Sequence, residues 1–483
     1  MNIKKGDIVE LQIDKYAFEG KGIAKVFKNE LLGLSDESSA DKNYVVFVQG
    51  SYPGDTVKAR LLKIKNSYAE ALAIKILKLS TERVTAECKF FGTCGGCKQQ
   101  DLNYDAQLKY KQQQVEEIFN KLGGFSGFEI ENIVPSKNIF HYRNKMEFSF
   151  GDIRWLTKDE LATDGKIDRD FALGLHIPRI FNKVLDVDEC FLQSETSNNI
   201  LNFTRNFFKS KNTSIYSTKT HTGFLRNLVI KQSYLTNDLM VNLVTSEEND
   251  ELFAGFSDEL IKQIPQVTTV INNINKKFAA VATGDYEKVF YGSGFIYDTI
   301  GRYKFRVSAN SFFQTNTLHA EHLYQTALDF ADLSGDEVVY DLYSGAGTIT
   351  IFISGKAKQV YAFESVESSI ADAKTNAELN GITNVSFYNA DLYKTFLPVV
   401  DKNKIPKPDV IIVDPPRSGM HTNTVDDVIK LAPQKIVYVS CNPATQVRDI
   451  KLMTAAGYKL VKIKPVDMFP HTFHIENVAL LTK

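Results

Sequence analysis

Glu337-Val-Val-Tyr-Asp-Leu-Tyr-Ser-Gly-Ala-Gly-Thr348 is the stretch of this sequence that decides the fold. An apolar run of strand type leads into a loop with two glycines, and a run of helix type follows at 349–354. The next predicted strand ends in Glu364, 19 residues beyond Gly345. This order is typical of a Rossmann-like α/β domain, in which such a carboxylate accepts hydrogen bonds from ribose hydroxyls.

The glycine loop favours one class of cofactor. A nicotinamide dinucleotide brings its pyrophosphate close to the helix start, and its motif has a third glycine where this chain has Thr350. S-adenosylmethionine has no phosphate and tolerates the shorter loop. The sequence therefore favours a methyltransferase over a dehydrogenase. We expect Gly345, Gly347 and Glu364 at the cofactor, and Asp391, after the third strand, near the adenine amine.

A further predicted strand ends in a cysteine. Residues 435–440 have the β-branched composition of a strand buried on both faces, and they lead into Cys441. Asn442 is a favoured helix N-cap and Pro443 suits the first helical position, so we expect a helix to begin beside the thiol. A helix N-terminus lowers the pKa of a nearby thiol, which predicts a nucleophile at Cys441. The alternative is a buried structural cysteine.

Two carboxylates follow the same logic. Residues 408–413 read as another buried strand, which runs into Asp414-Pro-Pro-Arg417, so Asp414 lies on a rigid loop at a strand end. Residues 467–476, Asp-Met-Phe-Pro-His-Thr-Phe-His-Ile-Glu, precede a last strand at 477–482. Taken alone, that segment is more typical of an ordinary polar surface loop.

The other four cysteines have the spacing of a metal site. Cys88, Cys94 and Cys97 form a C-x5-C-x2-C pattern that is rich in glycine, and Cys190 could supply a fourth ligand from a distance. In a cytosolic chain this spacing favours metal over disulfide. Four thiolates suit zinc and a [4Fe-4S] cluster about equally. Coincidence is the remaining alternative.

The rest of the chain predicts two more domains. Short strands within residues 1–78 predict a small OB-like β-barrel with a basic rim at Lys58, Arg60, Lys63 and Lys65. Mixed strands and helices at 79–300, including an amphipathic helix at 105–122, predict an α+β domain that carries the four cysteines. Residues 301–483 form the α/β domain. The acidic segment 30–41 has no assigned function.

Composition limits the function classes. The net charge is −1 at pH 7, so RNA binding would need local basic patches. The sequence has neither a signal-type apolar region nor a run of 18 apolar residues, which predicts a cytoplasmic protein.

Taken together, the motifs resemble the RNA uracil-C5 methyltransferase family. The resemblance spans nearly the whole chain, and its amino-terminal barrel is similar to a TRAM domain. It rests on Tyr142-Arg-Asn-Lys145, Ser311-Phe-Phe-Gln-Thr-Asn316, Asp341-Leu-Tyr-Ser-Gly-Ala-Gly347, Asp414-Pro-Pro-Arg-Ser-Gly419, Val439-Ser-Cys-Asn-Pro443 and Phe469-Pro-His-Thr472 with Glu476.

The resemblance implies roles for particular residues. Cys441 would be the nucleophile and Glu476 the base, while Gln314, Tyr343, Glu364 and Asp414 would surround S-adenosylmethionine and the target. It also implies that the four cysteines hold a [4Fe-4S] cluster. Because transfer RNA members generally lack those cysteines, it favours 23S ribosomal RNA as the substrate, with no obligate protein partner.

Uracil chemistry gives the expected mechanism. C5 becomes nucleophilic once a thiolate adds at C6, so Cys441 would add there, C5 would take the methyl group, and Glu476 would remove the C5 proton. His471 and His474 would shape the loop or relay the proton, and Phe312 or Phe313 would stack on the extruded base.

The alternatives are the same chemistry on transfer RNA or another ribosomal uridine, and an inactive iron–sulfur RNA-binding protein. An N-methyltransferase is disfavoured, because Arg417 stands where such enzymes commonly carry an aromatic residue.

Overall fold

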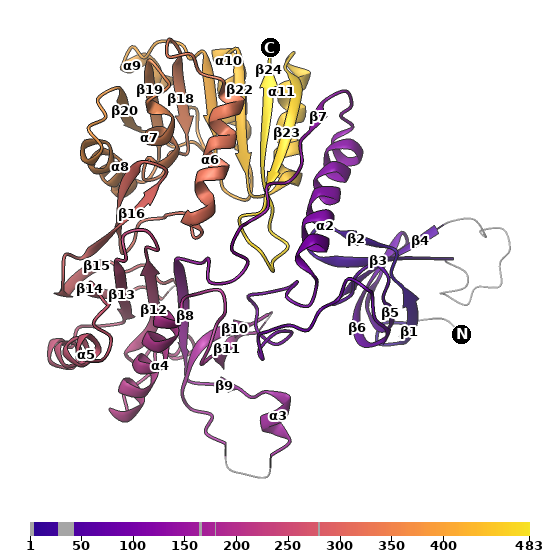
Figure 1. Cartoon of the computed structure of the whole chain (residues 1–483), viewed down its shortest axis with the longest axis vertical. Coiled ribbons are helices and arrows are strands. Elements are labelled where there is room, and N and C mark those ends of the chain that lie inside the picture. Colours follow the sequence, from indigo (N-terminus) through magenta and orange to yellow (C-terminus); the bar gives the residue numbers. More distant parts are fainter. Residues whose placement is uncertain (1–3, 28–42, 164–166, 179, 279–280) are drawn as a thin grey trace.

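A computed structural model describes residues 4–27, 43–163, 167–178, 180–278 and 281–483. The described chain forms three large sheets and one separate hairpin (Figure 1). The acidic segment 30–41 lies outside the described residues. Within these ranges, no helix is both long enough and apolar enough to cross a membrane.

The amino-terminal sheet has six strands in the order β1-β5-β6-β4-β3-β2. Along β5, buried Val57, Ala59 and Leu61 alternate with exposed Lys58 and Arg60, as expected for a sheet with one face on a core. The strands are β1 (Ile8–Gln12), β2 (Lys15–Ala17), β3 (Lys21–Phe27), β4 (Asn43–Gln49), β5 (Thr56–Ile64) and β6 (Tyr68–Lys78).

The middle sheet has eight mostly antiparallel strands in the order β15-β14-β13-β12-β8-β10-β11-β9. Its core contains a phenylalanine cluster contributed largely by α4 (Glu195–Ser210) and α5 (Asp250–Gln263). The strands are β8 (Lys145–Gly151), β9 (Arg154–Trp155), β10 (Ala172–Ile177), β11 (Ile180–Asp186), β12 (Leu225–Gln232), β13 (Leu239–Thr245), β14 (Thr269–Ile274) and β15 (Tyr286–Tyr291). A short helix, α3 (Lys158–Leu161), follows β9.

The carboxyl-terminal sheet has the order β20-β19-β18-β21-β22-β24-β23-β7. The run from β20 to β22 is parallel, and β24 lies antiparallel between β22 and β23. The strands are β18 (Val338–Leu342), β19 (Gln359–Glu364), β20 (Val385–Asn389), β21 (Val410–Val413), β22 (Lys435–Ser440), β23 (Lys459–Val466) and β24 (Glu476–Thr482). The predicted α/β fold of this region is confirmed.

Helices cover both faces of this sheet, each over its own apolar cluster. One cluster joins the sheet to α6 (Thr317–Ala331) and α7 (Thr348–Ser354), and the other joins it to α10 (Thr422–Leu431) and α11 (Pro443–Ala455). The remaining elements are α8 (Glu367–Leu379), α9 (Leu397–Lys402) and the hairpin of β16 (Phe295–Ile300) and β17 (Tyr303–Ser308).

One segment crosses the predicted domain limits. The helix expected at 105–122 is α2 (Tyr104–Glu117) with a π-helical extension, η2 (Ile118–Gly123), and β7 (Glu129–Ile130) follows it. Val115 and Phe119 belong to the apolar cluster that contains α11, and β7 pairs with β23. The segment assigned to the central domain by sequence thus packs on the carboxyl-terminal sheet (Figure 1). The domain limits at 78 and 300 stay predictions.

Candidate active site

The predicted site residues gather at one edge of the carboxyl-terminal sheet. Tyr343 follows β18, Glu364 ends β19, Asp414 follows β21 and Cys441 follows β22. The strand order runs outward from β18 in both directions, and in such sheets ligands bind beyond the carboxyl ends at this reversal.

Glu476 reaches the same edge from an antiparallel strand. Ser440 of β22 pairs with Asn477 of β24. Cys441 directly follows Ser440 and Glu476 directly precedes Asn477, so the two residues lie at the same end of this antiparallel pair. A parallel last strand would have placed the carboxyl group at the opposite edge of the sheet. The antiparallel insertion of β24 therefore brings the predicted base to the predicted nucleophile.

The helix start beside Cys441 is as predicted. Asn442 is the N-cap of α11, its side-chain oxygen accepts from the backbone N–H of Ala444 at 3.1 Å, and Pro443 is in the first turn. The predicted lowering of the thiol pKa is wrong. Burial raises the pKa of Cys441 to about 12, and Glu476 and Asp414 add to the rise, while Arg417 opposes it. The rise in the thiol pKa caused by burial and by the two carboxyl groups is larger than the lowering expected from the helix N-terminus.

Both carboxyl groups are tuned to near-neutral pH. Burial raises the pKa of Glu476 to about 8, with Asp414 adding to the rise and Arg417 opposing it. Burial also raises the pKa of Asp414 to about 7. A carboxyl group with such a pKa can accept and release a proton at physiological pH. This suits Glu476 to proton transfer.

Arg417 lies near the Cys441 thiol and the Glu476 carboxyl group, and it contacts His474. One guanidinium nitrogen lies 2.8 Å from Nδ1 and 3.1 Å from Nε2 of His474. Asn442 Nδ2 and Thr445 Oγ1 donate to the backbone oxygen of Arg417 at 3.1 and 3.2 Å, which ties the Asp-Pro-Pro-Arg loop to the start of α11. Burial, with Arg417, lowers the pKa of His474 to about 4, so its imidazole is neutral.

The glycine loop leaves room for a ligand. Gly345 and Gly347 have φ of 53° and 79°, and a Cβ on Gly345 would meet nothing within 4 Å. Glu364 Oε2 accepts from the Gly345 N–H at 3.0 Å, so the loop and the acidic strand end are joined. Asp341 Oδ1 and Ser344 Oγ are buried without a hydrogen-bond partner among the described residues. An open cradle with unsatisfied polar atoms fits S-adenosylmethionine.

Two predicted cofactor residues differ in their surroundings. Tyr343 has a left-handed φ of 66°, a strained conformation for a residue other than glycine, directly before the glycine loop. Asp391 is exposed after β20, accepts from the Tyr393 N–H at 3.0 Å and pairs with Lys394 at 3.2 Å. Its predicted place at the adenine amine stays a prediction.

The structure brings the four remaining cysteines around one cavity of about 320 Å³, lined by Cys88, Cys94, Cys97 and Cys190. All four are free thiols. Sγ of Cys94 accepts from the Gly96 N–H at 3.3 Å, and burial raises the pKa of Cys97 to about 12. Over the described ranges, no group of three or more His, Cys, Asp or Glu residues converges tightly enough to hold a metal ion.

Comparison with known proteins decides the family. A family model described as tRNA (uracil-5-)-methyltransferase matches residues 224–483, and a TRAM domain model matches residues 3–74. The chain belongs to the uracil-5 RNA methyltransferase family. It is 41% identical over 479 residues to an uncharacterized RNA methyltransferase of Chlorobaculum tepidum, covering 99% of this chain and 96% of the relative. It is 43% identical over 468 residues to one of Bacteroides thetaiotaomicron, covering 96% and 99%.

A solved relative extends this likeness to the structure of nearly the whole chain. The Pyrococcus abyssi tRNA (uracil-54, C5)-methyltransferase, solved in complex with S-adenosyl-L-homocysteine, has a TM-score of 0.73 and 29% sequence identity. The match covers 98% of this chain and 99% of that one. A cofactor of the S-adenosylmethionine type follows from the family and is consistent with the open glycine loop described above.

Within this methyltransferase, the segment before α6 links the middle sheet to the cofactor crevice. Asn144 Nδ2 donates to the backbone oxygen of Gln314 at 2.9 Å and to Thr317 Oγ1 at 3.1 Å. Of the two predicted stacking residues, Phe313 is 8% exposed and belongs to a core cluster, whereas Phe312 is 70% exposed. Only Phe312 is free to stack on a base.

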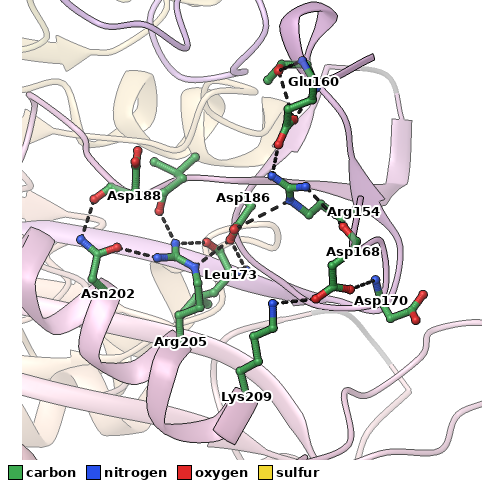
Figure 2. A network of polar contacts seen from close by, with 12 residues as sticks. Arg154, Glu160, Asp168, Asp170, Leu173, Asp186, Asp188, Asn202, Arg205 and Lys209 are labelled. Carbon is green, nitrogen blue, oxygen red and sulfur yellow. Dashed lines mark hydrogen bonds and ion pairs between the residues drawn. The ribbon is translucent and has the colours of Figure 1, made fainter. Parts of the chain in front are cut away.

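Sequence reasoning missed a stripe of α4 that fixes the position of Cys190. Asn198 Oδ1 accepts from the Cys190 N–H at 2.9 Å. Asn202 Nδ2 donates to the Asp188 backbone oxygen at 2.8 Å (Figure 2). Arg205 donates to Asp186 at 2.8 Å and to the Leu173 oxygen at 2.9 Å. The spacing of four and three residues along one helix face was a usable signal, because such residues share a side.

Proposed function

We propose that this methyltransferase transfers a methyl group from S-adenosylmethionine to C5 of a uridine in RNA, through a covalent adduct between Cys441 and C6 of the base. The observation that carries the proposal is that β22 and β24 bring Cys441 and Glu476 to the same end of the paired strands. A nucleophile and a base on two rigid strands suit a reaction that needs both on one ring.

The proposed steps follow from these side chains. Cys441 loses its proton to solvent, its sulfur adds to C6, and the electron pair of the C5–C6 double bond becomes available at C5. When bound in the crevice, S-adenosylmethionine supplies the methyl group to C5, and S-adenosyl-L-homocysteine leaves. Glu476 then removes the C5 proton, and the sulfur–C6 bond breaks as the double bond re-forms. Because the pKa of Cys441 is about 12 in the free protein, thiolate formation is the uphill step, and Arg417 is the cation that favours it.

The proposed substrate is 23S ribosomal RNA. The support is the set of four cysteines, which transfer RNA members of the family generally lack. Transfer RNA is the second candidate, and a specific observation favours it: the solved Pyrococcus relative is a tRNA (uracil-54, C5)-methyltransferase that matches this chain over nearly its full length.

We further propose that Cys88, Cys94, Cys97 and Cys190 hold a [4Fe-4S] cluster rather than zinc. The family resemblance implies a [4Fe-4S] cluster, and the four thiols line one cavity of about 320 Å³. A polynuclear cluster fills such a cavity and gives the buried sulfurs the positive charge that thiolates need.

Transfer of a labelled methyl group tests the function. Unmodified 23S ribosomal RNA and unmodified bulk transfer RNA are each incubated with the protein and labelled S-adenosylmethionine, and nucleosides are then separated. We expect 5-methyluridine in ribosomal RNA only. Label in transfer RNA alone would keep the chemistry and overturn the substrate, and no label in either RNA would overturn the function.

The adduct is tested separately. RNA that contains 5-fluorouridine cannot lose a C5 proton, so it should trap the wild-type protein as a covalent complex that resists denaturation. The Cys441→Ala variant should trap nothing, and trapping by that variant would exclude Cys441 as the nucleophile. Glu476→Gln should still be trapped but should release methylated uridine RNA more slowly.

A further inference from the structure

The loop at 467–474, which leads to Glu476, is held by buried groups from distant parts of the chain. Lys111 of α2 donates to Asp467 at 2.6 Å and to the Phe469 backbone oxygen at 3.1 Å, and both charged side chains are 0% exposed. Tyr142 donates to the Pro470 oxygen at 3.0 Å, and Asn316 donates to the Met468 oxygen at 2.9 Å. Groups from other parts of the chain therefore hold this loop in addition to its own hydrogen bonds, such as the one from Thr472 Oγ1 to the Phe469 oxygen at 2.8 Å.

A further link comes from the segment directly after Cys97. The N–H groups of Lys98 and Gln99 both donate to the backbone oxygen of His471, at 2.8 and 3.0 Å. His471 has a left-handed φ of 64°, a conformation that costs energy in a residue other than glycine. The segment after Cys97 is thus hydrogen-bonded to the loop at His471, the residue with the left-handed backbone, five positions before Glu476.

Gln107 joins the two segments. Its side-chain oxygen accepts from the His471 N–H at 2.8 Å, and its amide nitrogen donates to the backbone oxygens of Gln99 at 3.0 Å and Leu102 at 2.8 Å. The side chain is 0% exposed. One buried side-chain amide therefore supplies hydrogen-bond partners to backbone groups of the loop at 467–474, of the segment after Cys97 and of the residue before the N-cap of α2.

We propose that Gln107 is a positioning residue that couples the order of the cysteine segment to the placement of Glu476. When the four thiols are held around their cavity, the N–H groups of Lys98 and Gln99 stay bonded to His471, and the loop keeps Glu476 beside Cys441. When the thiols are released, Gln107 loses its bond to Gln99 and the loop becomes more mobile. The proposal rests on the proposed function for the role of Glu476 and, in the stripping experiment, for the [4Fe-4S] cluster.

The same helix offers a matched control. Gln114 lies seven residues further along α2 and is 3% exposed, but neither of its side-chain polar atoms has a hydrogen-bond partner among the described residues. The change Gln114→Leu removes a buried amide of the same size without breaking a contact. The change Gln107→Leu removes a similar volume of polar atoms together with the bonds to His471, Gln99 and Leu102.

Hydrogen exchange tests the coupling without any substrate. In Gln107→Leu, backbone amides of residues 467–476 should exchange at least tenfold faster than in wild type, while β22 is unchanged. Gln114→Leu should leave both unchanged. Wild-type protein should show the same loosening of 467–476 after an iron chelator and oxidant strip the cysteine site, which covers the case in which Gln107→Leu does not fold. Unchanged exchange in either the variant or the stripped protein would overturn the proposal.

Turnover then tests the consequence for catalysis. Gln107→Leu should be trapped on 5-fluorouridine RNA as fully as wild type, because Cys441 directly follows β22 and lies outside the loop at 467–474. On uridine RNA its kcat should fall at least tenfold at an unchanged KM, with covalent complex accumulating. Equal losses in trapping and turnover would show a general structural defect and overturn the positioning role. If wild type neither methylates nor is trapped, the proposed function fails, while hydrogen exchange still decides the coupling.

Discussion

At the scale of single residues, opposing effects of burial and charge around Cys441 and Glu476 set the pH dependence. Glu476 must be ionised to remove the C5 proton, and burial raises its pKa to about 8. We therefore predict that decay of the covalent complex on uridine RNA accelerates as pH rises and levels off above about pH 8. Rapid quenching across the neutral and alkaline range measures it. Decay that is independent of pH would remove Glu476 as the base.

Arg417 gives a second prediction at this scale. Because its charge opposes the rise in the pKa of Cys441, Arg417→Met should raise that pKa further and slow trapping on 5-fluorouridine RNA at neutral pH, by a factor of about ten for each unit by which the pKa rises. The loss should keep the same size across the neutral and mildly alkaline range, because the pKa of Cys441 lies above that range in both proteins, and Arg417→Lys should restore part of the rate. A loss that disappears at saturating RNA would instead indicate an RNA contact.

The thiol shows where sequence reasoning stops at this scale. Asn442 and Pro443 stand next to Cys441 in the chain, so the helix start could be predicted. Asp414 and Glu476 come from other strands, and their effect on the pKa depends on burial and on the antiparallel register of β24. The local sequence shows the helix start but neither the burial of the thiol nor the carboxyl groups beside it. For this reason the direction of the pKa shift of Cys441 was predicted wrongly.

At the scale of elements, α4 fixes the fourth cysteine through residues on one face. Arg205, 9% exposed, bonds Asp186 and two backbone oxygens near it (Figure 2). Arg205→Met removes one ion-pair partner of Asp186 and a donor to two backbone oxygens, while Asp186 keeps the Leu173 N–H and Arg154 as partners. The change should cost about 2 kcal/mol of unfolding free energy and lower the iron content. Lys209→Met breaks only an exposed pair with Asp168 and should cost less than about 1 kcal/mol.

Urea unfolding and iron analysis of both variants measure these effects. Equal stability and iron content in the two variants would show that the α4 stripe does not hold Cys190. The structure places this helix at Glu195–Ser210. The spacing of its polar stripe was visible in the sequence, but the partners of the stripe were not, because Asp186 and Leu173 lie on strands whose place beside α4 is a property of the middle sheet.

At the scale of the whole molecule, the sequence predicted the kinds of sheet but not how they meet. The apolar face of α2 was visible at 105–122, yet nothing local showed that it would pack on the carboxyl-terminal sheet. Gln107, Lys111 and Tyr142 each became meaningful only when that packing brought them to the loop at 467–474. Tyr16 and Tyr52 of the amino-terminal region also bond Gln99 and Lys98, so three regions meet at the cysteine segment.

This arrangement makes a prediction about RNA binding by the complete chain. The net charge is only −1, so phosphate contacts must be local, and Lys58 and Arg60 are exposed on the same face of β5. If each neutralises one phosphate, changing both to Ala should reduce the slope of log K against log salt by about 1.5. Trapping on 5-fluorouridine RNA at saturating RNA should stay unchanged, because the chemistry lies on the other sheet.

The matched control removes the same charge elsewhere. Lys211 follows α4 and Lys262 lies near the end of α5, and both side chains are exposed on the middle region, away from β5. Changing both to Ala should leave the salt slope within error of wild type. If the two double variants shift the slope equally, the RNA responds to total charge rather than to the TRAM domain. If neither double variant shifts the salt slope, the phosphate contacts lie elsewhere, and Lys58 and Arg60 are exposed to solvent without binding RNA.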